Sequence, residues 1–317
     1  MAEIIEYDVV IVGGGPGGLC AGLYSARANR KTVCLEKYIP GGQIANTGEV
    51  EDYIGFEHIQ GSELAQKFAD HATKFGLEIK MEEVEEVYSE GDYRLAKCAS
   101  GKVYRGRAVI LSTGGSPVFL DIPGEKEYSG RGVSYCAICD GAFFKGQVIA
   151  VVGGGDAAVE EGGYLTKYAS KVYIIHRRDE LRAQKIIQQR AFANDKIEFI
   201  WDSVVEEIEG DGKRVSNLKL KNVKTGEMSD LAVGAVFPYI GFHPNSDITR
   251  EEMKKDEGGY ILTDYKMATS IPGVFACGDV RSQLVRQVTN AVGDGTTAAV
   301  AAEKYIEALE DKHAKRA

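Results

Sequence analysis

The hydrophobic pattern of the chain contains one arrangement twice: a short β-branched run, a glycine-rich loop and a helix-favouring segment. The first copy occupies residues 7–12, 13–18 and 19–28, and the second occupies 148–152, 153–158 and about 157–168. Runs of consecutive β-branched residues are typical of parallel strands that are buried on both faces. Because the segment around 8–37 recurs as the segment around 148–178, the pattern predicts an α/β protein with two Rossmann-like dinucleotide-binding units.

Between the two copies, the pattern predicts one helix, a meander and a crossing segment. Residues 62–75 carry a capping residue and apolar positions at helical spacing, and residues 77–105 alternate as in a small antiparallel meander. Residues 40–56 are punctuated by Pro and Gly, which favours a loop folded over a ligand. The strand 108–112 then leads into a crossing between domains at 113–117.

After the second copy, short alternating runs at 196–201 and 216–223 are expected to complete a second sheet. The strand 235–241 leads out of this sheet, and a return crossing begins at 243–245. The chain closes with a strand at 271–277 and an alanine-rich helix at 296–309.

Composition and charge limit the classes of function. The chain has 317 residues, of which 44% are hydrophobic and 27% charged, so it resembles a soluble globular protein with room for two domains. Its net charge of -9 argues against nucleic acid and anionic membranes as partners. No apolar run approaches the roughly 20 residues of a membrane span, and no secretory signal is visible. We therefore expect a cytoplasmic protein.

The first glycine loop predicts a dinucleotide site. Gly13, Gly15 and Gly18 fit G-x-G-x-x-G between a strand and a helix, where the helix N-terminus favours a pyrophosphate. Glu36 ends the next strand, 23 positions after Gly13, where an acid accepts hydrogen bonds from an adenosine ribose. This copy is typical of an FAD or NAD site.

The second glycine loop, with Gly153, Gly155 and Ala158, differs at the same offset. His176, 23 positions after Gly153, is followed by Arg177 and Arg178, so cationic donors replace the acid. Arginines bind a 2′-phosphate bidentately, which favours NADP. Arg182 reaches the same face if a helix starts near Asp179.

Of the six cysteines, only Cys136 and Cys139 form a C-x-x-C pair suited to redox chemistry in a reducing compartment. Asp140 follows directly and is a candidate acid–base group for thiol chemistry, or else a capping residue. A flavin-dependent NADP reductase of ferredoxin or flavodoxin would need no dithiol. A structural zinc site would need about four ligands, and neither a second C-x-x-C nor a suitably spaced histidine supplies them.

A third cofactor signal lies near the end of the chain. A short apolar strand ends in Gly278 and Asp279, where glycine allows close backbone approach and the carboxylate can bind hydroxyls of a flavin's ribityl chain. The segment 290–295 is expected to precede the last helix, whose N-terminus could face the isoalloxazine. Since the chain begins with a dinucleotide loop, this signal indicates that the first domain is discontinuous.

Together these motifs resemble the low-molecular-weight, bacterial-type thioredoxin reductases over nearly the whole chain. The resemblance implies two Rossmann-like domains of three-layer ββα organisation, the second inserted into the first. An FAD domain would comprise 1–116 and 245–317, and an NADPH domain carrying the dithiol would comprise 117–244. It also implies a homodimer in which the inserted domain rotates, and thioredoxin, or another small redoxin, as partner.

The resemblance further implies roles for individual residues. Cys139 would take electrons from the flavin, Cys136 would attack the disulfide of thioredoxin, and Asp140 would be the acid–base group. FAD would be bound by Gly13, Gly15, Pro16, Gly18, Glu36, Gly42, Gln43, Asn46, Thr113, Gly114, Gly278, Asp279, Arg286 and Gln287. NADPH would be bound by Gly153, Gly155, Asp156, Ala157, His176, Arg177, Arg178 and Arg182, and no metal is expected.

Overall fold

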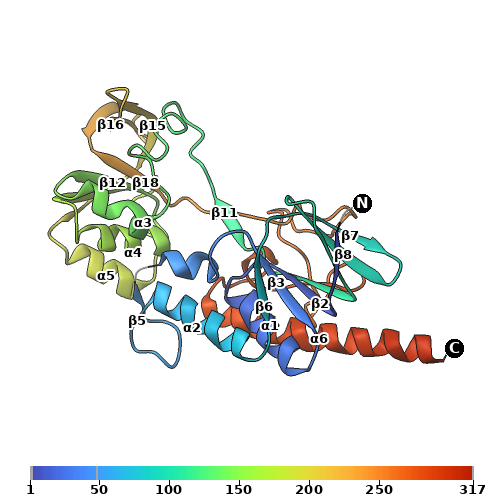
Figure 1. Cartoon of the computed structure of the whole chain (residues 1–317). Coiled ribbons are helices and arrows are strands. Elements are labelled where there is room, and N and C mark those ends of the chain that lie inside the picture. The colour runs from blue at the N-terminus through green and yellow to red at the C-terminus, as the bar shows by residue number, and fades with distance from the viewer. Residues whose placement is uncertain (1–2, 48, 316–317) are drawn as a thin grey trace. The chain divides into compact units, whose positions relative to one another are not determined.

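The computed structural model describes residues 3–47 and 49–315 (Figure 1). The chain divides into two compact units: unit 1 is Met1–Ser116 with His243–Ala317, and unit 2 is Pro117–Phe242. No helix within the described residues is both long and apolar enough to cross a bilayer.

Unit 1 is built on a parallel sheet of strand order β20-β10-β2-β3-β6. Its strands β2 and β10 consist only of Val, Ile, Leu and Ala and are buried throughout, because layers cover both faces of the sheet. The bounds are β2 Val9–Val12, β3 Thr32–Glu36, β6 Glu78–Met81, β10 Ala108–Leu111 and β20 Val274–Ala276. The meander expected at 77–105 is therefore wrong at its start, since β6 joins the parallel sheet.

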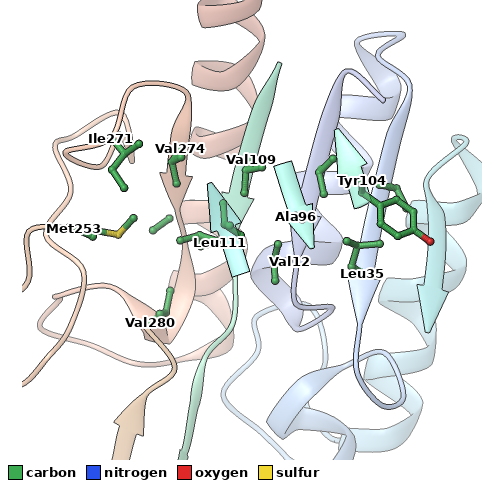
Figure 2. Close-up of a cluster of buried hydrophobic side chains, with 14 of the residues drawn as sticks. Val12, Leu35, Ala96, Tyr104, Val109, Leu111, Met253, Ile271, Val274 and Val280 are labelled. Carbon is green, nitrogen blue, oxygen red and sulfur yellow. The ribbon is translucent and has the colours of Figure 1, made fainter. Parts of the chain in front are cut away.

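Alternate residues of β2 face different layers. Val10 and Val12 pack toward a second sheet of order β1-β9-β8-β7, in a cluster that includes Tyr104. In this sheet β7, β8 and β9 are antiparallel, and β1 pairs in parallel with β9. Figure 2 shows this cluster, with side chains of β10 between those of β20 and β2. Val9 and Ile11 pack instead toward the helices. The bounds are β1 Ile4–Glu6, β7 Val84–Glu90, β8 Tyr93–Cys98, β9 Val103–Gly106, α1 Pro16–Arg27, α2 Gly61–Lys74 and α6 Val288–Ala314.

Helix α6 begins eight residues earlier than the alanine-rich pattern predicts, so the segment 290–295 is helical rather than a loop. It runs beside α1 (Figure 1). A Cβ on Gly295 would lie 2.2 Å from the carbonyl oxygen of Gly17, so the two backbones are in close contact there. Close packing at glycine thus explains why a segment of low helix propensity is helical.

The segment 40–56 is not wholly irregular. It contains a 3-10 helix and one strand of a small antiparallel pair, which packs on α2 through a cluster of Val50, Ile59 and Leu64. The bounds are η1 Gly42–Asn46, β4 Glu49–Val50 and β5 Ile59–Gln60, and a further 3-10 helix, η3, spans Gly278–Val280.

Unit 2 repeats the same plan. Its parallel sheet has the order β14-β13-β12-β18, matching β6-β3-β2-β10 of unit 1. Ala150 and Val152 of β12 pack toward the antiparallel sheet β15-β16-β17, and Ile149 and Val151 pack toward the helices. The bounds are α3 Ala137–Asp140, η2 Gly141–Phe144, β12 Val148–Val152, α4 Asp156–Leu165, β13 Lys171–Ile175, α5 Lys185–Phe192, β14 Ile197–Ile200, β15 Ser203–Gly210, β16 Val215–Asn222, β17 Met228–Ala232 and β18 Ala235–Pro238.

The two segments that connect the units pair as a two-stranded ribbon, β11 (Gly115–Pro117) with β19 (Phe242–Pro244). Asn245 anchors this ribbon on the side of unit 1, because its side-chain amide and backbone bond to Thr113 and Gly114. Both crossings are therefore held as one element.

Candidate functional site

Cys136 and Cys139 form a disulfide in unit 2, with their Cα atoms 5.3 Å apart. Cys136 precedes the short helix α3 as its N-cap, and its Sγ accepts a hydrogen bond from the backbone N–H of Cys139 at 3.1 Å. Cys139 is exposed and Cys136 is half-buried. The pair is therefore open to solvent on one side, as a sulfur that exchanges with another protein must be.

Polar contacts fix the helix that carries the disulfide. The Tyr239 hydroxyl accepts the N–H of Ala137 at 3.0 Å, and the Ser134 hydroxyl accepts the N–H of Cys136 at 3.2 Å. Burial raises the pKa of Tyr239, and the charges of Glu161 and Asp140 raise it further. Asp140 is half-buried and lies next to Cys139 in α3.

Glu161 was not anticipated from the sequence. It lies on α4, and its Oε2 is buried without a hydrogen-bond partner in the described part of the chain. Burial, and then the charge of Glu160, raise the pKa of Glu161 to about 7. Glu161 lies three residues after Ala158 and four residues before Leu165, which are both buried. This helical spacing could have predicted that Glu161 lies on the buried face of α4.

The first glycine loop connects β2 to α1 in unit 1. A Cβ on Gly18 would lie 2.0 Å from the carbonyl oxygen of Gly13, so only glycine allows this close approach. Nothing lies within 4 Å of a Cβ position at Gly15, and Pro16 is the first residue of α1. The loop therefore has open space in front of a helix N-terminus, as a pyrophosphate requires.

Glu36 lies beside this loop. Its carboxylate accepts the backbone N–H of Gly14 at 2.6 Å and that of Tyr38 at 2.9 Å. Each carboxylate oxygen has a second lone pair, so the group can still accept hydrogen bonds from a ribose.

Two loops lie next to the first glycine loop. The N–H of Gly41 bonds to the carbonyl of Gly14 at 2.8 Å, and a Cβ on Gly42 would lie 3.1 Å from the Cα of Gly15. Gln43 and Asn46 follow in η1. Thr113 and Gly114 follow β10, the strand that pairs with β2, so they belong to the same edge of the sheet.

At the end of β20, Gly278 has a φ of +71°, which favours glycine, and Asp279 follows it in η3. Burial raises the pKa of the Asp279 carboxyl, while the charge of Arg286 opposes this shift. Arg286 and Gln287 come just before α6, so its N-terminus is at these residues and not at 296. The carboxyl ends of β2, β3, β10 and β20 thus gather the predicted FAD residues at one edge of the sheet.

The second glycine loop connects β12 to α4 in unit 2. Asp156 begins α4, with Ala157 after it, and its carboxylate accepts the backbone N–H of Gln184 at 2.7 Å. A Cβ position at Gly155 meets nothing within 4 Å, whereas one at Gly154 would lie 2.4 Å from the His176 ring. This loop is therefore also open in front of a helix.

His176 is buried, with 5% of its surface exposed, and its Nε2 has no partner among the described residues. Burial, and then the charges of Arg182 and Arg178, lower the pKa of His176. The side chains of Arg177, Arg178 and Arg182 are exposed, and none forms an ion pair within the described chain. Three cations without acidic partners can bind an anion.

The expected helix near Asp179 is wrong, since α5 begins at Lys185. The backbone N–H groups of Arg182 and Ala183 donate instead to the carbonyl of Gly154, at 2.7 and 3.2 Å. Arg182 is nevertheless beside the glycine loop, through these bonds rather than through helical spacing. No group of three potential metal ligands occurs within residues 3–47 and 49–315.

A family model described as pyridine nucleotide-disulphide oxidoreductase matches residues 7–295. The chain belongs to this family. The description of the family names a pyridine nucleotide and a disulphide, and the bonded Cys136–Cys139 pair fits it.

Within the family, the chain is similar to a thioredoxin reductase of Bacillus subtilis (strain 168), at 49% identity over 311 residues and 98% of each chain. It also matches two solved structures. The thioredoxin reductase of Lactococcus lactis is 50% identical with a TM-score of 0.92, covering 95% of this chain and 99% of that one. The thioredoxin reductase of T. acidophilum is 36% identical with a TM-score of 0.91, covering 96% and 99%.

These matches confirm the resemblance and the predicted fold, an α/β protein with two dinucleotide-binding domains, the second inserted into the first. They also confirm the expected class of enzyme. The competing interpretation as a ferredoxin or flavodoxin reductase is not favoured.

Proposed function

We propose that the protein is an NADPH-dependent thioredoxin-disulfide reductase, in which two electrons pass from NADPH through FAD to the Cys136–Cys139 disulfide and on to thioredoxin. The observation that carries this proposal is the partly exposed disulfide in a unit that has its own glycine loop and cationic group. A reductase of another small redoxin would use the same residues. The physiological partner is therefore identified by comparing the rates at which different thioredoxin-like proteins are reduced.

Unit 1 is proposed to bind FAD. Open space at Gly15 and the free amides of α1 suit the pyrophosphate, and the carboxylate of Glu36 suits the ribose. The partly buried Asp279 carboxyl, whose pKa is raised by burial, suits the ribityl hydroxyls, because their hydrogen bonds would replace the water that burial removes. The remaining contacts are proposed from Gly13, Pro16, Gly18, Gly42, Gln43, Asn46, Thr113, Gly114, Gly278, Arg286 and Gln287.

Unit 2 is proposed to bind NADPH. The open glycine loop suits the pyrophosphate, and the exposed guanidinium groups of Arg177, Arg178 and Arg182 suit the 2′-phosphate. The buried Nε2 of His176 has no partner among the described residues, so a ligand hydroxyl or phosphate oxygen would satisfy it. Gly153, Gly155, Asp156 and Ala157 complete the proposed set.

The dithiol is proposed to act by thiol–disulfide exchange. The Cys136 thiolate attacks one sulfur of the thioredoxin disulfide, forming a mixed disulfide and releasing the other sulfur as a thiolate, which Asp140 protonates. Cys139 then attacks Cys136, which restores the internal disulfide and releases the second thioredoxin sulfur. The amide of Cys139 that donates to Sγ of Cys136 favours negative charge on the attacking sulfur.

The proposed domains are an FAD domain of 1–116 and 245–317 and an NADPH domain of 117–244. A homodimer and a cytoplasmic location stay predictions of the sequence.

The proposal is tested with purified protein and thioredoxin. We expect a yellow protein that reduces thioredoxin with NADPH, and we expect Cys136→Ser and Cys139→Ser to abolish this turnover while NADPH still bleaches the flavin. A colourless protein that takes up no FAD contradicts the proposal, as does full thioredoxin turnover in either serine variant.

A further inference from the structure

A buried ion pair joins helix α6 to the loop after β20 in unit 1. Nη1 of Arg281 lies 3.2 and 3.1 Å from the two carboxylate oxygens of Asp294. Both side chains are largely buried, with 15% and 9% of their surfaces exposed. Because desolvation offsets most of the attraction within such a pair, added stability is a weak reason for burying it. Its position beside the proposed flavin site suggests another reason.

Asp294 binds the backbone of that site directly. Its Oδ2 accepts the N–H of Gly278 at 3.1 Å, and Gly278 begins the turn that carries Asp279. The charge of Asp294 also reaches Asp279, since it adds to the effect of burial in raising the pKa of the Asp279 carboxyl. Asp294 therefore acts on the turn both by a hydrogen bond and by its charge.

Arg281 is held by two further side chains. Its Nε donates to the Thr263 hydroxyl at 3.0 Å, and its Nη1 donates to Oε1 of Gln283 at 3.1 Å. With its oxygen oriented toward Arg281, Gln283 has a buried Nε2 that finds no acceptor in the described residues. Buried donors are normally satisfied, so this one indicates a ligand acceptor next to the cluster.

We propose that Arg281 and Asp294 are positioning residues of the flavin site: Asp294 fixes the amide of Gly278, and Arg281 offsets the negative charge of Asp294 and so reduces its effect on the flavin. This inference rests on the proposed FAD site in unit 1. Reduction of a flavin adds negative charge, so an uncompensated arginine favours the reduced flavin and an uncompensated aspartate favours the oxidised flavin. Removal of Asp294 leaves the positive charge of Arg281, and removal of Arg281 leaves the negative charge of Asp294. The two substitutions should therefore shift the flavin potential in opposite directions.

The test is the midpoint potential of the bound flavin in purified holoenzymes, together with the dissociation constant of FAD. We expect Asp294→Asn to raise the potential and Arg281→Met to lower it. We expect the dissociation constant of FAD to rise about tenfold or more in Arg281→Met. The reason is that Asp294, which holds Gly278, then loses its charge-assisted contact with Arg281. Arg281→Lys keeps the charge and is expected to return the potential toward that of the unaltered protein.

The matched control is Arg250 with Glu86, an ion pair of unit 1 whose side chains are 57% and 31% exposed. Arg250→Met and Glu86→Gln are expected to shift neither quantity. Shifts of the same sign in the Asp294 and Arg281 variants, or shifts no larger than the controls, overturn the inference. If Arg281→Met does not fold, Arg281→Gln replaces it and is likewise expected to lower the midpoint potential. An unaltered protein that binds no FAD overturns the proposed function instead.

Discussion

Glu161 makes the stability of the protein depend on pH in a direction opposite to that of most acidic residues. Its carboxyl is buried on α4 without a partner for Oε2 in the described chain, and its pKa is raised from an ordinary value of 4.5 to about 7. Between these two pH values the folded protein keeps a proton that the unfolded chain has lost. The free energy of unfolding therefore falls as pH rises from about 4.5 to about 7.

The size of the effect follows from the shift. A difference of about 2.5 pKa units corresponds to about 3 kcal/mol of destabilisation above pH 7. Glu161→Gln cannot ionise, so we expect it to be more stable than the unaltered protein by up to about 3 kcal/mol at pH 8, with this advantage almost lost at pH 5.

Urea unfolding of both proteins across pH 5–8 measures the difference. Glu160→Gln is the control, since it removes only the second cause of the shift and is expected to give a smaller gain in the same direction. A stability difference between Glu161→Gln and the unaltered protein that is the same at pH 5 and pH 8 would refute the reasoning.

Three further predictions concern the proposed sites. Arg177→Ala with Arg178→Ala is expected to raise KM for NADPH about tenfold or more per arginine and to leave KM for NADH unchanged; an equal rise for both nucleotides contradicts a role in reading the 2′-phosphate. Asp140→Asn is expected to slow thioredoxin reduction about 10²-fold or more, with NADPH-driven flavin reduction unchanged in stopped flow. Gly18→Ala is expected to lower FAD content and Tm, because its Cβ would lie 2.0 Å from a carbonyl oxygen; Gly163→Ala, which meets nothing within 4 Å, is the control.

The local sequence was sufficient to predict the central strands of each unit. The β-branched runs at 9–12 and 148–152 are strands buried on both faces, and such strands need no information beyond their own residues and the glycine loops that follow. The same pattern also explains why the proposed cofactor residues lie at the carboxyl edges of the two sheets.

The errors lie where distant residues decide the local conformation. The segment 176–184 is irregular because its amides bond to Gly154 and to the carboxylate of Asp156, 28 residues before Gln184. The start of α6 could not be read locally, since its glycine-containing first turns are helical only through close packing on α1. Short strands such as β6 and β14 alternate like meander strands but pair in parallel with β3 and β13.

The buried charges of Glu161, Arg281 and Asp294 could not be predicted from the sequence, for a related reason. A Glu-Glu pair on a helix is usually solvated, and only the packing of α4 against the sheet buries the second acid. Arg281 and Asp294 are 13 residues apart, and no motif links them. Their pairing depends on α6 reaching the turn after β20.

The closing of the unit 1 sheet by the last part of the chain has a consequence for synthesis on the ribosome. Strand β10 pairs with β2 on one side and with β20 on the other, and β20 is synthesised only after the whole of unit 2. Unit 2 is continuous and can fold as soon as it emerges. Until β20 and α6 follow, β10 is an open edge strand, whose unpaired backbone favours intermolecular pairing. We therefore expect a nascent chain to need a chaperone most at the stage when unit 2 has been synthesised and β20 has not.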